Sequence, residues 1–216
     1  LKDNTVRGWT YSSVYGGLTA DSEWEMLTGN SMAFMPTGTI PYQQYANSVK
    51  YSLVEYLESL GYESWATHPC SGANWNRTDV YSRLGFDRSV FYEEYPKEDL
   101  IRTFITDREM YKLMLDRYEQ QPEDKPLFMF GVTVQNHGAY FVELTGDIDP
   151  LTLEGPVAND FAENYLTLIH ESDKSFETLI HELEKSDRPT VVLMFGDHQP
   201  ALDMEFLEQL YGGPLE

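Results

Sequence analysis

The stretch Thr190-Val191-Val192-Leu193-Met194-Phe195-Gly196-Asp197-His198 runs from six uncharged, mostly apolar residues into a glycine, a carboxylate and an imidazole. A short apolar run of this kind is typical of a strand that is buried on both faces, as in a parallel sheet. We therefore expect Thr190–Phe195 to be a buried strand that places Asp197 and His198 at its carboxyl end.

The same order of a helix followed by a strand occurs three times. A helix is predicted over residues 159–185, which Pro189 ends, before the strand at 190–195. A capping box at 106–109 predicts a second helix, followed by a strand at 127–134 that leads to His137. Helical spacing over 42–60 precedes a third strand at 62–67, which ends at His68. The pattern predicts an α/β fold with a largely parallel sheet flanked by helices, in one domain over residues 1–216. Ligands bind such sheets at the carboxyl ends of the strands.

Composition restricts the possible partners. The chain has 15 basic and 36 acidic residues, a net charge of −21, which argues against nucleic-acid binding and against broad adhesion to an anionic membrane surface. A single anionic head group held by a metal ion and one arginine remains compatible with this charge.

The one cysteine, Cys70, excludes an intrachain disulfide and leaves the cellular compartment undetermined. No run of residues is long and apolar enough to span a bilayer, and no signal peptide is recognisable. Because the chain opens at Leu1 without a methionine, we expect it to be part of a longer protein.

Histidines and an aspartate at strand ends are the first candidates for chemistry. Asp197 and His198 can both ligate one divalent cation, and Gly196 permits a sharp turn before them, although a structural role fits the same residues. His137 is a candidate metal ligand or a hydrogen-bonding partner of a substrate oxygen, or else a satisfied histidine at the start of a loop. His170 and His181 flank an apolar helix face and are expected to be structural.

Two further segments offer a hydroxyl and a guanidinium. Residues 16–23 read as a glycine turn that enters a helix, where Thr19 would be a nucleophile if a metal lowered its pKa, or where Thr19 or Asp21 would simply cap the helix. Arg77 can hold a phosphate through two parallel hydrogen bonds beside the flat face of Trp75, but an ordinary surface arginine is an equal alternative.

Taken in order, four motifs resemble the lipoteichoic-acid-synthase family, a sulfatase-like branch of the alkaline phosphatase superfamily. The resemblance covers nearly the whole chain. Each motif is moderately specific, and their correct order and spacing make the resemblance strong. The motifs are Gly17-Leu18-Thr19-Ala20-Asp21-Ser22-Glu23, Asn74-Trp75-Asn76-Arg77 with Val80-Tyr81 and Leu84-Gly85-Phe86-Asp87, Thr133-Val134-Gln135-Asn136-His137, and Phe195-Gly196-Asp197-His198.

The resemblance implies a transferase domain on the outer face of a bacterial cell membrane, anchored by helices outside this chain. Such enzymes move a glycerol-phosphate unit from phosphatidylglycerol, for example onto a glycerol-phosphate polymer, through a phosphothreonine. The implied nucleophile is Thr19, and the implied ligands of one manganese or magnesium ion are Thr19, Asp197 and His198. The implied substrate-binding residues are His68, Trp75, Arg77 and His137. The resemblance does not place Arg102 or Arg108 in the pocket.

One departure from the family pattern concerns the metal. The family's first strand carries a further metal-binding acid, usually a glutamate, and no such strand precedes Gly16. We therefore expect an alkaline-phosphatase/sulfatase-like fold lacking its first strand, with an incomplete metal site. The alternatives are a non-catalytic module that binds cell-envelope head groups or polymers, and a phosphoethanolamine transferase or phosphodiesterase relative. Thr19 argues against a true sulfatase, since those enzymes use a formylglycine made from cysteine or serine.

Overall fold

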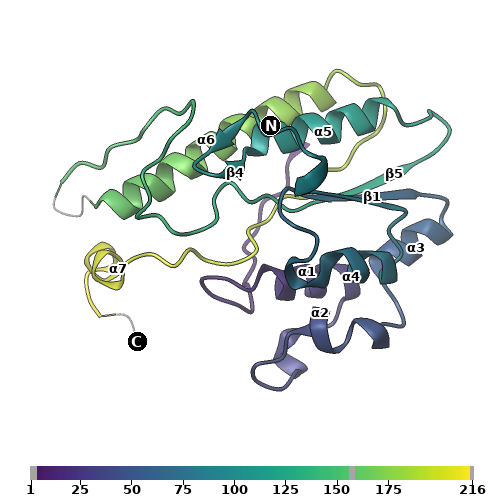
Figure 1. Cartoon of the computed structure of the whole chain (residues 1–216), viewed down its shortest axis with the longest axis horizontal. Coiled ribbons are helices and arrows are strands. Elements are labelled where there is room, and N and C mark those ends of the chain that lie inside the picture. Colours follow the sequence, from purple (N-terminus) through teal and green to yellow (C-terminus); the bar gives the residue numbers. More distant parts are fainter. Residues whose placement is uncertain (1–3, 156–158, 215–216) are drawn as a thin grey trace.

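A three-stranded parallel sheet forms the centre of the molecule (Figure 1). The computed structural model describes residues 4–155 and 159–214. Strand β1 (Glu63–His68) pairs with β2 (Arg88–Phe91) on one side and with β5 (Leu127–Gly131) on the other, which gives the order β2-β1-β5. All three strands run in the same direction, so their carboxyl ends share one edge of the sheet.

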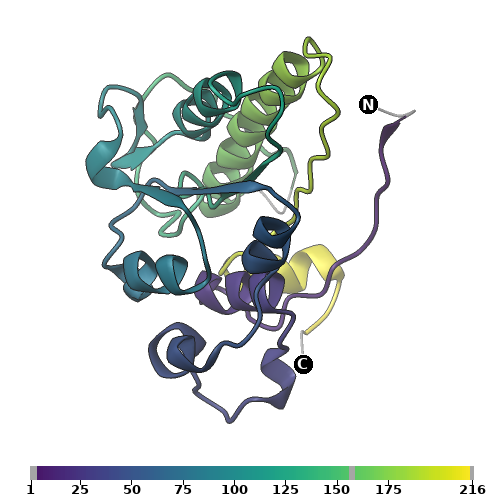
Figure 2. The same cartoon turned by 90° about the vertical axis from the view of Figure 1, so that its right-hand side faces the viewer.

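Helices cover both faces of this sheet (Figure 2). Helices α5 (Asp107–Glu119) and α6 (Asp160–Leu183) lie together on one face, and α1 (Thr19–Thr28), α3 (Leu53–Ser59) and α4 (Arg77–Arg83) lie on the other. The expected α/β architecture, a parallel sheet flanked by helices, is therefore confirmed.

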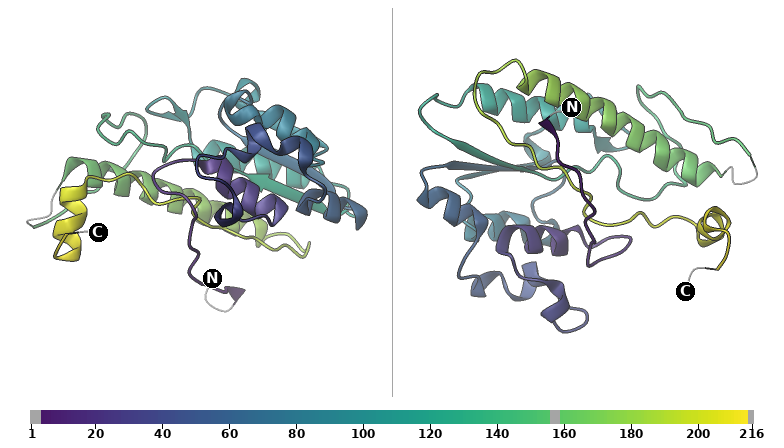
Figure 3. Two further views of the ribbon diagram at one scale, coloured as in Figure 1. Left: turned by 90° about the horizontal axis from the view of Figure 1, so that it is seen from below. Right: turned by 180° about the vertical axis from the view of Figure 1, so that it is seen from behind.

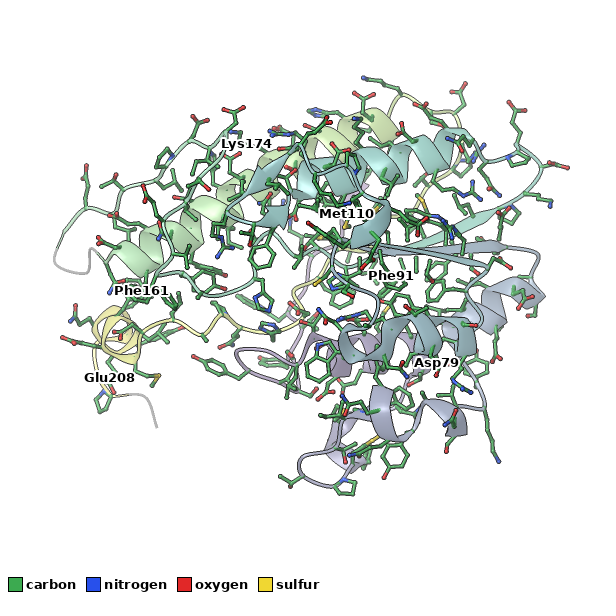
Figure 4. The ribbon with its side chains drawn as sticks, in the orientation of Figure 1. Asp79, Phe91, Met110, Phe161, Lys174 and Glu208 are labelled. Atoms are coloured by element: carbon green, nitrogen blue, oxygen red, sulfur yellow. The ribbon has the colours of Figure 1, made fainter. Side chains whose placement is uncertain are left out.

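Side chains of the strands alternate between two apolar clusters, as the pleat of a strand requires. Trp65 of β1 packs with Met110 of α5 on the α5–α6 side, whereas Ala66 packs with Phe91 and Phe130 on the α1–α4 side (Figure 4). The sheet is thus the middle layer of a three-layer domain, and it fixes where the strand ends lie.

Shorter elements connect these layers. Helix α7, at the end of a long extended segment, lies away from the sheet (Figure 1). The remaining elements are the 3₁₀ helices η2 (Met32–Phe34), η3 (Ala46–Ser48), η4 (Asn74–Asn76) and η5 (Tyr92–Glu94), helices α2 (Pro41–Gln44) and α7 (Met204–Tyr211), and the antiparallel strands β3 (Leu100–Ile101) and β4 (Phe104–Ile105).

The predicted helix over 42–60 is interrupted in the structure. Helix α2 ends at Gln44, and a separate helix, α3, begins at Leu53. The hydroxyl of Ser52 accepts a hydrogen bond from the backbone N–H of Glu55 at 3.0 Å, which caps α3 at its own N-terminus. The prediction of one continuous helix was wrong because helical spacing alone does not reveal this internal start.

The predicted buried strand over 190–195 is also wrong for the structure described here. These residues are extended but belong to no strand, and Val191 and Leu193 are 96% and 67% exposed. A strand requires a neighbour that pairs with its backbone, and no described segment pairs with residues 190–195 in this way. Strand β5 likewise stops at Gly131, short of the predicted 134.

Among the described residues, no helix combines the length and the apolar character needed to cross a membrane.

Candidate active site at the carboxyl edge of the sheet

Thr19 is the first residue of α1 and directly follows a left-handed turn. Gly16 has φ +68° and Leu18 φ +67°, and a Cβ at Gly16 would lie 3.2 Å from the Cβ of Ala201. Leu18 is the N-cap, and no side chain caps this helix, so neither Thr19 nor Asp21 has the capping role considered as an alternative. The half-buried Thr19 hydroxyl therefore stands at an uncapped helix N-terminus.

Hydrogen bonds hold Asp197 beside this helix. The hydroxyls of Ser12 and of Ser22, in the first turn of α1, each donate to the carbonyl oxygen of Asp197 at 2.6 Å. Next to them, the N–H of Gly16 donates to the carbonyl of Gln199 at 3.0 Å, where the two extended segments run side by side (Figure 3). Residues before and after Thr19 in the sequence are thus hydrogen-bonded to Asp197 and Gln199, the two sequence neighbours of His198.

The side chains of Asp197 and His198 lie next to each other. Nδ1 of His198 lies 2.9 Å from the carbonyl of Gln199, which only accepts, so Nδ1 carries a proton. Nε2 of His198 lies 3.2 Å from Oδ2 of Asp197. A carboxylate oxygen and an imidazole nitrogen at this distance can share a proton or a cation.

A divalent cation fits this pair in part. One carboxylate and one imidazole are ligands that manganese accepts, and the Thr19 hydroxyl could supply a third. Residues 4–155 and 159–214 hold no group of three or more His, Cys, Asp or Glu side chains arranged for a metal. The expectation of an incomplete metal site stays a prediction.

His68, at the end of β1, is a buried neutral imidazole. It is 5% exposed, and its Nδ1 lies 2.8 Å from the carbonyl of Val132, so Nδ1 again carries the proton. Burial, and then the positive charge of Arg77, lower the pKa of His68 to about 4, although Glu23 acts in the opposite direction. At neutral pH the Nε2 of His68 can accept a hydrogen bond but cannot donate one.

Arg77 is buried and paired with a carboxylate, which the sequence did not predict. Its side chain is 2% exposed, and its guanidinium donates from Nε and Nη2 to Glu23 of α1. Nη1 has only a long bond of 3.5 Å, to the carbonyl of Asn74. Burial alone would raise the pKa of Glu23, but the charge and hydrogen bonds of Arg77 outweigh it, and the pKa is lowered. The assignment of Arg77 to the substrate pocket stays a prediction, with Nη1 as the nitrogen left for a ligand.

Two tyrosines complete the surroundings of Glu23. The hydroxyls of Tyr42 and Tyr81 donate to its Oε2 at 3.0 and 2.7 Å. Burial, and then the charge of Glu23, raise the pKa of both phenols, so they remain protonated donors. Glu23 lies four residues after Thr19, on the same side of α1, and this network therefore connects the nucleophile helix with the Asn74–Arg77 segment.

Trp75 and His137 lie at the rim of the same edge. Trp75 is half-buried with φ +57°, and its ring packs against the cluster that contains Phe91. His137 is exposed, and its Nδ1 lies 3.0 Å from the carbonyl of Gly138. The loop of His137 is also bonded to Arg102, a residue that the resemblance does not place in the pocket.

A cavity of about 250 Å³ opens on the other side of Asp197. Its lining includes Thr10 and Ser12, Ser22 and Met26 of α1, and Leu193. The predicted substrate-binding residues are not among its lining residues. We therefore place the candidate site at the strand ends, and not in this cavity.

Comparisons with known proteins identify the family and the fold. Residues 1–214 match the sequence model of the family described as Sulfatase. The chain is 38% identical over 199 residues to a protein named for cyclic β-1,2-glucan modification in Rhizobium meliloti (strain 1021), covering 91% of this chain and 31% of the relative. It is 26% identical over 211 residues to the capsular polysaccharide biosynthesis protein RkpI of the same organism, covering 94% and 36%. The chain thus spans about a third of the length of these curated relatives.

Two solved structures share the fold. The lipoteichoic acid synthase LtaP from Listeria monocytogenes has a TM-score of 0.68 at 21% identity, over 81% of this chain and 42% of that one. The Streptococcus pyogenes phosphoglycerol transferase GacH, in complex with sn-glycerol-1-phosphate, has a TM-score of 0.69 at 24% identity, over 89% and 51%. At these identities the likeness establishes the alkaline-phosphatase/sulfatase-like fold.

Proposed function

Since the chain belongs to the sulfatase family, we propose that it is part of an enzyme that transfers a glycerol-phosphate unit through a phosphothreonine at Thr19. The observation that carries this proposal is the contact between α1 and the Asp197–His198 segment. Ser22, three residues after Thr19, donates to the carbonyl of Asp197, and no side chain caps α1 at Thr19. A hydroxyl at an uncapped helix N-terminus, beside a carboxylate and an imidazole, is suited to attack a phosphodiester.

The reaction consists of two displacements at phosphorus. In the first, Thr19 Oγ bonds to phosphorus, the bond from phosphorus to the donor alcohol breaks, and the released alkoxide takes up a proton. In the second, an acceptor hydroxyl attacks the same phosphorus and frees Thr19. A manganese or magnesium ion held by Asp197, His198 and Thr19 would supply the positive charge that lowers the pKa of the Thr19 hydroxyl.

The remaining side chains bind and orient the substrate. Because neutral His68 offers a lone pair at Nε2, it accepts a hydrogen bond from a hydroxyl group, such as one on glycerol, and does not hold a phosphate oxygen. His137 and Trp75 line the pocket, and Nη1 of Arg77 can donate to a phosphate oxygen if the Asn74 carbonyl moves away.

The names of the relatives support one class of donor and one class of acceptor. GacH, a phosphoglycerol transferase, binds sn-glycerol-1-phosphate, which supports a phosphatidylglycerol-type lipid as the donor. The names of the two Rhizobium relatives refer to a glucan and to a capsular polysaccharide, which supports a polysaccharide as the acceptor. A glycerol-phosphate polymer is the alternative acceptor. We place the reaction at the outer face of a bacterial cell membrane, because the donor is a membrane lipid.

The test is the covalent intermediate. The whole enzyme of which we propose this chain to be part is incubated with short-chain phosphatidylglycerol and manganese, and both the intact mass and the released diacylglycerol are measured. Thr19→Ala should form no glycerol-phosphate adduct, whereas Thr19→Ser should retain part of the activity because a hydroxyl remains. Ser13→Ala, whose exposed hydroxyl bonds to Glu25, is the matched control. An adduct on the Thr19→Ala protein would overturn the assignment of the nucleophile, and absence of any adduct on the parent protein would overturn the transfer itself.

A further inference from the structure

The turn between β3 and β4 places an arginine against the His137 loop. Arg102 Nη2 donates to the carbonyls of Gln135 and His137 at 2.7 and 2.9 Å, and Nη1 donates to that of Ala139 at 3.3 Å. Its backbone N–H also donates to the carbonyl of Thr145 at 3.0 Å. The Arg102 side chain therefore binds the carbonyl group of His137 and the carbonyl group of one residue on each side of it.

The same turn also contacts the His137 ring. The guanidinium of Arg102 lies 5.0 Å from the centroid of the Phe104 ring, and the His137 ring lies 5.7 Å from the same centroid at an interplanar angle of 44°. Arg102 fixes the backbone of His137, while Phe104 restricts the direction of its imidazole. An exposed histidine with both restraints has fewer orientations available than one on a free loop.

Arg102, like Arg188, has no acidic partner among the described residues. Five arginines form ion pairs with Asp or Glu side chains, namely Arg77, Arg83, Arg88, Arg108 and Arg117. The bonds described for the Arg102 guanidinium all go to carbonyl oxygens, which are neutral. In a chain of net charge −21, an unneutralised cation beside a candidate substrate-binding residue favours an anion there.

The backbone at Arg102 does not explain why an arginine stands there. Its φ is +58°, a left-handed conformation that glycine adopts more easily than any L-residue. Glycine would therefore relax the backbone at this position, and the presence of an arginine must be explained by the contacts of its side chain.

We propose that Arg102 is a positioning residue of the active site, which holds His137 toward an anionic phosphodiester substrate. This inference rests on the proposed function. Arg102 acts through His137, so its removal should have little further effect once the imidazole is gone.

The test measures binding of sn-glycerol phosphate and the nuclear magnetic resonance signal of the His137 ring. Arg102→Gln should weaken binding about tenfold, the effect of losing one charge-assisted interaction. It should also shift and broaden the His137 signal. Arg102→Gly should do the same although it relaxes the backbone, which separates the side chain's role from folding. Arg88→Gln, which breaks an exposed ion pair with Glu94, is the control and should change neither quantity.

A double-variant cycle with His137→Ala gives the decisive comparison. In the His137→Ala background, Arg102→Gln should weaken binding less than about twofold. Equal losses in both backgrounds, or an unchanged His137 signal in Arg102→Gln, would overturn the inference. If His137→Ala alone leaves binding intact, the substrate assignment of the proposed function fails instead, while the His137 signal still decides whether Arg102 positions that ring.

Discussion

Single residues at this site have roles that their neighbours determine, and Arg77 is the clearest case. A role as a phosphate ligand is easy to assign to an arginine after Asn-Trp-Asn, but Arg77 is also the only cation described on buried Glu23. The sequence could not reveal this, since Glu23 is one of 36 acidic residues and lies 54 positions away. Of the other candidates, Thr19 begins a helix and His68 ends a strand, as expected, whereas the segments before His137 and Asp197 are not strands up to those residues. The roles of all these residues stay predictions.

The pairing of Arg77 with Glu23 gives a stability prediction. Arg77→Met should lower the free energy of unfolding by about 3–5 kcal/mol, because it leaves a buried carboxylate without its counter-charge. Adding Glu23→Gln should recover part of the loss, since no lone charge remains and the amide oxygen still accepts from Tyr42 and Tyr81. Urea denaturation measures each value.

The control for this prediction is Arg83→Met. It breaks a pair with Asp79 that solvent screens, and it should change the free energy of unfolding far less than Arg77→Met does. Equal losses for Arg77→Met and Arg83→Met would contradict the prediction. Any loss of ligand binding on substitution of Arg77 must be compared with this stability effect before it is assigned to a phosphate contact.

Secondary-structure elements were predictable where local chemistry marks both ends. The capping box led to α5, where Thr106 accepts from the N–H of Glu109 at 3.1 Å, and the apolar stripe of α6 located Asp160–Leu183 within two residues. The prediction of a strand over 190–195 was wrong because a strand must pair with a neighbouring segment, and the sequence of the strand itself does not show whether that neighbour is present. The turn at Arg102 also has no local signal, since a left-handed arginine is rare.

The N-terminus of α5 gives a prediction for pH. Asp107 is buried between α5 and α6, where it accepts from Ser172, and its Oδ1 has no described partner. Burial raises the pKa of Asp107 from 3.8 to about 6, despite the opposing hydrogen bonds of Ser172 and Gln135. A raised pKa means that the protonated carboxyl stabilises the fold fully below pH 3.8, and that this stabilisation is lost as the pH rises through about 6.

Comparison with Asp107→Asn isolates this contribution. The variant has no titrating carboxyl, so the parent protein should lose about 3 kcal/mol of stability relative to the variant between pH 4 and pH 7. Urea denaturation of both proteins at unit steps of pH measures the difference. A difference that stays constant over this range would show that the pKa of Asp107 is the same in the folded and the unfolded protein.

At the scale of the whole molecule, the sheet and its two helix layers bring distant segments to one edge. Residue 19, residue 68, residue 137 and residues 197–198 come from four parts of the chain, and the order of the motifs predicts that they form one site. The layers themselves followed from the alternation of helices and apolar runs. Their contacts, such as the bond between Ser22 and the carbonyl of Asp197, required coordinates.

The exposed segment 190–195 has a consequence for the behaviour of this chain in concentrated solution. Six residues without charge, proline or glycine, and with unpaired backbone groups, are a template for intermolecular β-pairing and fibril growth. The net charge of −21 opposes such assembly by repulsion, which salt screens beyond about 8 Å at 0.15 M.

We expect the light scattering and the thioflavin fluorescence of the protein to increase with salt concentration. Val191→Lys should suppress both, whereas Val6→Lys, the same change at a fully exposed valine outside the apolar run, should not. Equal suppression by the two lysines would assign the effect to charge alone.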